Sequence, residues 1–338
     1  MSSLVVLLLS AHFAAATTPA SMFPSARQWD VAAATRITRG SSEPAPLSSA
    51  RTSAAAPPGA QRWGRKPPMG WRGWQQFGLN SNESNFRAGA NMLVDRSRTV
   101  DGVPTSLFDL GYNWVGQDDG WQECNSGPGG VGWHNADGSP NLNRSKFPDL
   151  PGAVKYVHSL NLSVAWYLNN CQCADHGSDP KYFQGDVKFV LEHGMDGVKI
   201  DGCGGEKNID LFHSLFNAPG GSRGHSDFYI ENCHDNGHVA PNASYCPYTA
   251  WRHSYDYDGL LFDTGVYILN MNAGNSANDS RPHCWAYLQM LMVGVNQLDQ
   301  PTPSTQTPLN RVETRSHFGM WCIVSSPLYL LRIIIIYA

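Results

Sequence analysis

The sequence lacks any excess of positive charge. Its 338 residues include 24 Lys and Arg against 28 Asp and Glu, which gives a net charge of -4 and a pI near 6.3. A chain that binds nucleic acid needs a basic surface to attract phosphates, so this balance argues against nucleic acid as a partner.

Long apolar runs are also missing. Beyond the N-terminus no stretch is long enough to cross a membrane, so we expect no membrane span.

The N-terminal region has the composition of a targeting segment. Residues 1–16 are predicted to be a signal peptide, with an apolar core at Leu4–Leu9 and small residues for cleavage at Ala14–Ala16, although no Lys or Arg precedes the core. Residues 17–62, rich in Ala, Ser, Pro and Thr, are expected to be disordered. The secretory pathway is therefore predicted, with an extracellular or lysosomal or vacuolar destination. Glycosylation sequons agree with it and begin at Asn82, Asn143, Asn161, Asn242 and Asn278.

The most informative stretch is a short strand-like run, Val198–Ile200, that ends in Asp201 and is followed at once by glycines. A buried parallel strand delivers a charged group to the mouth of a barrel in this way. Lys199 shares a face of the strand with Asp201 and favours its ionised form, which a carboxylate nucleophile requires. The alternative interpretation is that Asp201 only caps the following helix.

Other strand-like runs end in polar groups in the same manner. They lead into Asp118, Glu231 and Asp256, and helix-like stretches such as 150–160 and 182–193 lie between them. Alternation of strands and helices predicts a parallel α/β architecture. Polar groups at the strand ends predict a (β/α)8 TIM barrel with its active site at the mouth.

Six segments carry a resemblance that covers residues 67 to about 330. The segments are Pro67–Trp74, Gln117–Trp121, Val198–Cys203, Glu231–His234, Cys246–Asp256 and Arg315–Leu328. In this order and with these motifs the chain resembles the α-galactosidase (melibiase) family, glycoside hydrolase family 27.

The resemblance implies a retaining exo-glycosidase that releases terminal α-linked galactose from oligosaccharides or glycoconjugates, without a cofactor or a metal. Its nucleophile falls on Asp201 and its acid/base on Asp256, for which Asp258 and Asp263 compete. In a retaining mechanism the two carboxyl groups stand about 5–5.5 Å apart.

The resemblance also implies a galactose pocket. Asp118 and Asp119 correspond to the pair that holds the 4- and 6-hydroxyls, and Trp74 to the ring that floors the pocket, although Asp118-Asp119-Gly120 alone could be a simple turn. Two adjacent acceptors can bind a sugar diol and discriminate its stereochemistry. The remaining predicted sugar-binding residues are Tyr167, Lys199, His234, Arg252 and Gln289.

Two departures from the family pattern open alternatives. Gln289 stands where the family carries an aspartate, and an amide can form hydrogen bonds but holds no charge. After Leu330 the chain ends in a run, Ile333–Ile336, that resembles no part of the family, so we expect a barrel over 63–338 that is truncated after strand 8 and lacks the C-terminal β-sandwich. The alternatives are a catalytically impaired or inactive sugar-binding relative, an α-N-acetylgalactosaminidase and a β-L-arabinopyranosidase.

The cysteines predict disulfide bonds near the site. By resemblance, Cys203 pairs with Cys171 or Cys173, and Cys233 pairs with Cys246; the spacing leaves the first choice open. A zinc site that uses Cys171, Cys173, His176 and Cys203 is disfavoured, because ordinary zinc knuckles space their ligands differently.

Overall fold

The structure, a computed structural model, describes residues 63–169, 171–173, 179–217, 228–233, 241–242, 244–254, 256, 262–272, 280–294 and 308–332. The predicted signal peptide, the 17–62 segment and Ile333–Ile336 lie outside these ranges, as do His176, His234 and Asp258. Within the described ranges, no helix has the length and apolar character needed to cross a bilayer.

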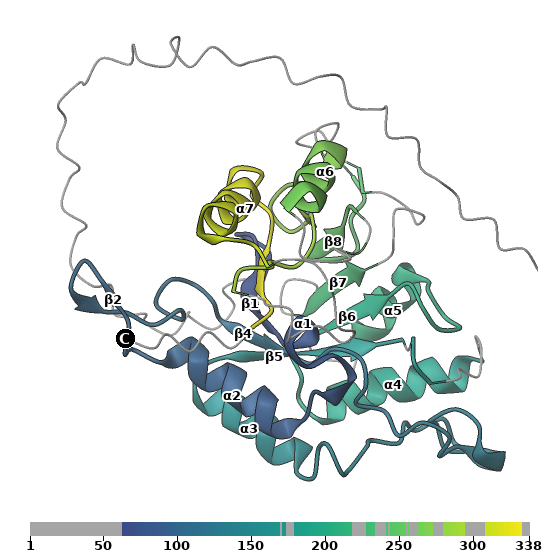
Figure 1. The fold of residues 1–338 in the computed structure, drawn as a ribbon. Coiled ribbons are helices and arrows are strands. Elements are labelled where there is room, and N and C mark those ends of the chain that lie inside the picture. Colours follow the sequence, from purple (N-terminus) through teal and green to yellow (C-terminus); the bar gives the residue numbers. More distant parts are fainter. Residues whose placement is uncertain are drawn as a thin grey trace, which may run out of the picture. The chain divides into compact units, whose positions relative to one another are not determined.

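Eight parallel strands form one sheet that curls on itself, as Figure 1 shows, and this is the (β/α)8 barrel expected from the sequence. In sheet order the strands are β10 (Leu328–Leu330), β1 (Met69–Arg72), β4 (Trp114–Gly116), β5 (Ser163–Leu168), β6 (Gly197–Asp201), β7 (Tyr229–Cys233), β8 (Ala250–Arg252) and β9 (Trp285–Tyr287). A parallel bridge between Leu291 and Leu330 brings the segment after β9 beside β10. There the Leu291 amide donates to the carbonyl of Tyr329 at 3.0 Å. A small hairpin, β2 (Thr99–Val100) and β3 (Val103–Pro104), stands apart from this sheet.

Helices alternate with most of the strands, and none is described between β7 and β8. They are α1 (Trp74–Phe77), α2 (Glu83–Val94), α3 (Leu150–Ser159), α4 (Pro180–Glu192), α5 (Ile209–Phe216), α6 (Phe262–Asn272) and α7 (Arg311–Ile323). Asn or Asp caps several of their N-termini: the side chain of Asn82 accepts from an amide of α2, that of Asp149 from α3 and that of Asn208 from α5. At α7, Asn310 and Glu313 form a capping box. These caps fix where each helix begins, and therefore how long each loop at the barrel mouth is.

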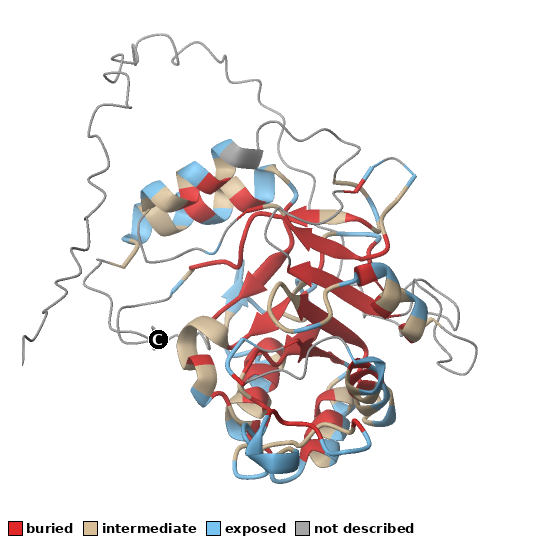
Figure 2. Ribbon diagram, turned by 90° about the vertical axis from the view of Figure 1, so that its right-hand side faces the viewer, coloured by how far each residue is buried: buried red, intermediate tan, exposed pale blue. Residues whose placement is uncertain are grey.

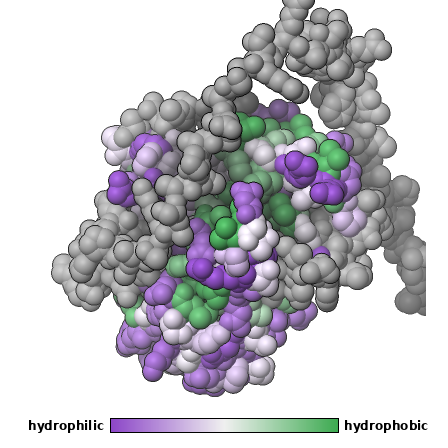
Figure 3. All heavy atoms as spheres, turned by 90° about the vertical axis from the view of Figure 1, so that its left-hand side faces the viewer, coloured by the Kyte–Doolittle hydropathy of each residue, from purple (hydrophilic) through white to green (hydrophobic). Residues whose placement is uncertain are grey.

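The core lies between the strands and the helices that cover them. All six residues of β5 are buried, as a strand covered on both faces requires. Helix α3 buries Leu150, Ala153, Val154 and Val157 on one side and exposes the other. Figure 2 shows the same pattern in the ribbon, with buried strands inside and helices exposed on their outer sides. On the face that Figure 3 shows, polar and apolar side chains of the described residues both reach the surface.

Three disulfides link the loops: Cys124–Cys173, Cys171–Cys203 and Cys246–Cys284. Of the two candidates for Cys203, the structure selects Cys171. The predicted Cys233–Cys246 pair is wrong. Cys233 is a free, buried thiol on the same side of β7 as Glu231. Cys246 meets Cys284 because β8 pairs with β9, which starts one residue after Cys284.

Candidate active site

The predicted site residues within the described ranges come from the C-terminal halves of the strands or from the segments that follow. Lys199 and Asp201 belong to β6 and Arg252 ends β8, while Trp74 begins α1, two residues after β1. Because parallel strands end at the same rim of a barrel, these side chains gather at one mouth. His234, which was predicted to bind the sugar, lies outside the described residues.

Both carboxylate oxygens of Asp201 have hydrogen-bond donors. The Gly202 amide donates to Oδ1 at 2.7 Å, and the Tyr167 hydroxyl donates to Oδ2 at 3.0 Å. Burial first, and then the charge of Asp201, raises the pKa of Tyr167 well above its usual value, so this hydroxyl stays a donor. The ammonium of Lys199 lies 3.7 Å from Oδ2. The side chain of Asp201 is 19% exposed, so it is oriented by its neighbours and still accessible.

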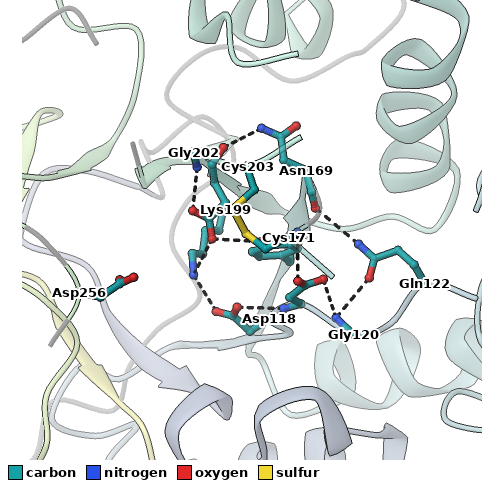
Figure 4. Close-up of a disulfide and its surroundings, with 12 residues drawn as sticks. Asp118, Gly120, Gln122, Asn169, Cys171, Lys199, Gly202, Cys203 and Asp256 are labelled. Atoms are coloured by element: carbon teal, nitrogen blue, oxygen red, sulfur yellow. Dashed lines mark hydrogen bonds and ion pairs between the residues drawn. A yellow bond between two sulfur atoms is a disulfide. The ribbon is translucent and has the colours of Figure 1, made fainter. Parts of the chain in front are cut away.

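Lys199 also joins the sugar-binding pair predicted at the end of β4. Its Nζ lies 2.9 Å from Oδ2 of Asp118, and both side chains are buried (Figure 4). Burial tends to lower the pKa of Lys199, but the Asp118 carboxylate and other neighbours raise it overall. One cation therefore faces the carboxylates of both Asp118 and Asp201.

A second buried cation was not predicted as part of the site. The guanidinium of Arg72 lies 2.6 Å from Oε2 of Glu231 and 3.7 Å from Oδ2 of Asp118. Glu231 also accepts hydrogen bonds from the hydroxyls of Tyr229 at 3.0 Å and Tyr287 at 2.9 Å. An arginine in an otherwise apolar strand needs a buried partner, and this was the available signal in the sequence.

Asp119 differs in environment from its neighbour Asp118. It accepts from the amides of Gly120 at 2.7 Å and Cys171 at 3.3 Å, and it is 2% exposed. Burial, with a smaller contribution from Asp118, raises its pKa to about 6. Burial therefore favours the protonated form of Asp119 at the end of β4.

This burial predicts a pH dependence of stability. The Asp119 carboxyl group keeps its proton up to about pH 6 when folded, but only up to about pH 4 when unfolded. Its contribution to the free energy of unfolding is therefore full below about pH 4 and is lost as the pH rises through 6. Titration of this group should lower the free energy of unfolding by on the order of 3 kcal/mol as the pH rises from 4 to 7. We expect this decrease to be absent in Asp119→Asn. Denaturant unfolding of both proteins from pH 4 to 7 measures it, and parallel curves would contradict the assignment.

Asp256 follows β8, and two side chains donate hydrogen bonds to its carboxylate. Arg252 donates a charged hydrogen bond to its Oδ1, and the amide of Gln289 donates to the same oxygen at 3.2 Å. The side chain of Asp256 is 63% exposed, whereas that of Arg252 is buried. Figure 4 shows Asp256 apart from the pair formed by Lys199 and Asp118. Gln289 thus contacts the predicted acid/base directly, without bringing the negative charge that an aspartate would add.

The Cys171–Cys203 disulfide borders the site, two residues beyond Asp201. Cys171, Asp201 and Cys203 form the one cluster of metal-ligand type among the described residues. Because both sulfurs are in the disulfide, they are not thiolates and cannot bind zinc as such.

A (β/α)8 barrel that gathers carboxylates at its mouth is compatible with glycoside hydrolysis, which needs two of them. The family model for alpha galactosidase A matches residues 66–332, and the chain belongs to this family, glycoside hydrolase family 27.

Individual relatives agree with this placement. The chain is 26% identical over 306 residues to a probable alpha-galactosidase B of Penicillium simplicissimum, covering 79% of this chain and 64% of that protein. A putative alpha-galactosidase/melibiase of Bacteroides fragilis matches in structure with a TM-score of 0.61 at 23% identity, over 80% of this chain and 56% of that one. The alfa-galactosidase of Saccharomyces cerevisiae, solved with raffinose, matches with a TM-score of 0.58 at 19% identity, over 79% and 59%. These structures share the fold, and the chain spans less than two thirds of the length of these relatives.

Proposed function

We propose that this chain is a retaining exo-glycosidase that releases terminal α-linked galactose by double displacement. The observation that carries the proposal is the contrast between two carboxylates at one barrel mouth. Asp201 is largely buried and oriented by donors on both oxygens, whereas Asp256 is exposed and bound to Arg252. An oriented carboxylate suits a nucleophile, and a carboxyl group open to solvent can reach both a leaving oxygen and water, as an acid/base must. The family and its α-galactosidase relatives support the same substrate.

In the first step of this mechanism, a carboxylate oxygen of Asp201 attacks the anomeric carbon. The bond to the leaving oxygen breaks as protonated Asp256 gives that oxygen its proton. In the second step, the Asp256 carboxylate takes a proton from water, and the hydroxide oxygen attacks the same carbon. The ester bond to Asp201 then breaks, and galactose leaves with its configuration retained.

Sugar recognition falls to the buried part of the site. Asp118 and Asp119 offer acceptors to sugar hydroxyls, and Lys199 offers a donor between Asp118 and Asp201. Gln289, through its hydrogen bond to Oδ1, positions Asp256.

The direct test assays purified protein on aryl α-galactoside, aryl α-N-acetylgalactosaminide and aryl β-L-arabinopyranoside. Preferential turnover of another glycoside would reassign the sugar, and galactose binding without any turnover would favour an inactive sugar-binding relative.

The secretory route remains part of the proposal. Disulfides persist in oxidising compartments, and the three found here support folding in such a compartment.

The acid/base role of Asp256 predicts a selective defect. We expect Asp256→Ala to slow α-galactosides with sugar leaving groups by roughly 10²–10⁴-fold, and activated aryl galactosides far less, because only a basic leaving oxygen needs a proton. Initial rates on both substrates measure the difference. Asp263→Ala, at the first turn of α6, tests the competing candidate in parallel. Equal losses on both substrates would remove Asp256 from the role, and a selective loss in the Asp263→Ala protein would transfer the role to Asp263.

A further inference from the structure

Helix α7 buries two of its residues, His317 and Trp321, and both bind the backbone of one segment. The two side chains are 0% exposed and lie four residues apart, so they occupy the same face of the helix. Their rings pack together with 4.0 Å between the centroids. The indole N–H of Trp321 donates to the carbonyl of Gln289 at 2.6 Å, and the amide of Met292 donates to Nε2 of His317 at 3.1 Å. Helix α7 therefore holds both ends of the segment 289–292, which begins two residues after β9.

The contact of His317 requires its neutral form. A backbone amide can only donate, so Nε2 must be unprotonated to accept from Met292. Burial lowers the pKa of His317 to about 4, which keeps the ring neutral at neutral pH. The hydrogen bond to the segment is therefore retained across the neutral range.

The segment held by α7 carries the side chain that contacts Asp256. The amide oxygen of Gln289 accepts from the Met290 amide at 2.7 Å, and its amide nitrogen donates to Oδ1 of Asp256 at 3.2 Å. The backbone of the segment thus orients the carboxamide, while Trp321 holds the backbone carbonyl of the same residue. Because Asp256 is 63% exposed, its position depends on the few groups that contact it, such as Arg252 and Gln289.

Other hydrogen bonds join this part of the chain to β10 and the residues before it. The Leu291 amide donates to the carbonyl of Tyr329 at 3.0 Å, and the Leu288 amide donates to Oγ of Ser326 at 3.2 Å. These bonds attach the segment to the sheet. The bonds from α7 are separate from the strand pairing, so a substitution in α7 can release Gln289 while the sheet stays intact.

We propose that Trp321 and His317 are positioning residues for the acid/base: they hold the segment 289–292, and through it Gln289, in place beside Asp256. The inference rests on the proposed function, because it takes Asp256 as the group that protonates the leaving oxygen. Both residues are fully buried and do not reach the substrate, so their loss should resemble a milder form of the Asp256→Ala defect. A displacement of about 1 Å can cost on the order of 100-fold in rate, and the remaining contact with Arg252 limits the displacement here.

The first test measures kcat of Trp321→Phe on raffinose, which has a sugar leaving group, and on an activated aryl α-galactoside. The phenyl ring keeps most of the packing and removes the hydrogen-bond donor. We expect kcat to fall about tenfold on raffinose and less than about twofold on the aryl substrate, because only a basic leaving oxygen needs a proton. Trp166→Phe is the matched control, since its indole is also fully buried but has no hydrogen-bond partner among the described residues. It should change both rates by the same factor.

The second test determines whether Trp321 acts through Gln289. In a Gln289→Ala background, Trp321→Phe should cause no further loss that is selective for raffinose. His317 provides independent variants, which also serve if Trp321→Phe does not fold. We expect His317→Leu to lose about fivefold on raffinose alone. His317→Gln should retain nearly wild-type rates, because its amide oxygen can accept from Met292.

Three results would each overturn the inference: equal losses on the two substrates, a selective loss of the same size in Trp166→Phe, and an undiminished effect of Trp321→Phe in the Gln289→Ala background. A wild-type chain that hydrolyses neither substrate would instead reject the proposed function. Crystal structures of Trp321→Phe and His317→Leu then decide the inference without activity. Displacement of the Gln289 carboxamide from Asp256 would support it, and an unchanged contact would refute it.

Discussion

Replacement of Asp201 by asparagine is expected to abolish turnover and preserve the fold. The amide cannot attack the anomeric carbon, so no glycosyl-enzyme forms, and we expect a loss of at least about a thousandfold in kcat, roughly 4 kcal/mol of barrier. The local structure should persist, because the amide oxygen can still accept from Gly202 and the amide nitrogen can face Tyr167. Steady-state rates and circular dichroism melting measure the two parts of this prediction.

A fluorosugar that traps the glycosyl-enzyme identifies the nucleophile independently of the rates. The labelled peptide of the wild-type protein should contain Asp201, and the variant should take up no label. A label on Asp256 or on either carboxyl group of the β4 end, Asp118 or Asp119, would contradict the assignment.

The barrel and much of its mouth could be predicted from the sequence for a simple physical reason. A parallel strand buried on both faces is a short apolar run, and a charged residue at its end has one favourable place, the rim. Asp201 and Asp118 follow this rule in β6 and β4. Contacts between loops obey no such rule. The partner of Cys246 depends on the path of the chain before β9, and for that reason the predicted pairing with Cys233 was wrong.

Gln289 shows a different limit of the sequence. By resemblance alone, the loss of an aspartate at this position suggested an impaired site. The structure instead directs the amide nitrogen at the carboxylate of Asp256 and lets the amide oxygen accept from Met290 at 2.7 Å. The amide nitrogen and the amide oxygen of Gln289 therefore both form hydrogen bonds. These contacts depend on the position of Gln289 two residues beyond β9. No local sequence pattern specifies that position.

The buried pair of Arg72 and Glu231 carries the largest expected effect on stability. Both side chains are fully buried, with 2.6 Å between the guanidinium and the carboxylate. We expect Arg72→Met to lower the free energy of unfolding by about 3–5 kcal/mol, because it leaves the charge of Glu231 in the core without a cation. The hydroxyls of Tyr229 and Tyr287 solvate that charge only in part.

A double-variant cycle separates the pair from the packing of the side chains. Adding Glu231→Gln to Arg72→Met removes the uncompensated charge and should recover a large part of the loss, of order 1–3 kcal/mol. Arg87→Met is the matched control, since Arg87 forms a more exposed pair with Glu83 on α2, and it should cost less than about 1 kcal/mol. Urea unfolding followed by tryptophan fluorescence, measured for the wild type, Arg72→Met, Glu231→Gln, the double variant and Arg87→Met, gives the coupling and the control values. If Arg72→Met proved as mild as Arg87→Met, or if the second substitution deepened the loss, the buried ion pair would not be what holds β1 to β7 in the barrel interior.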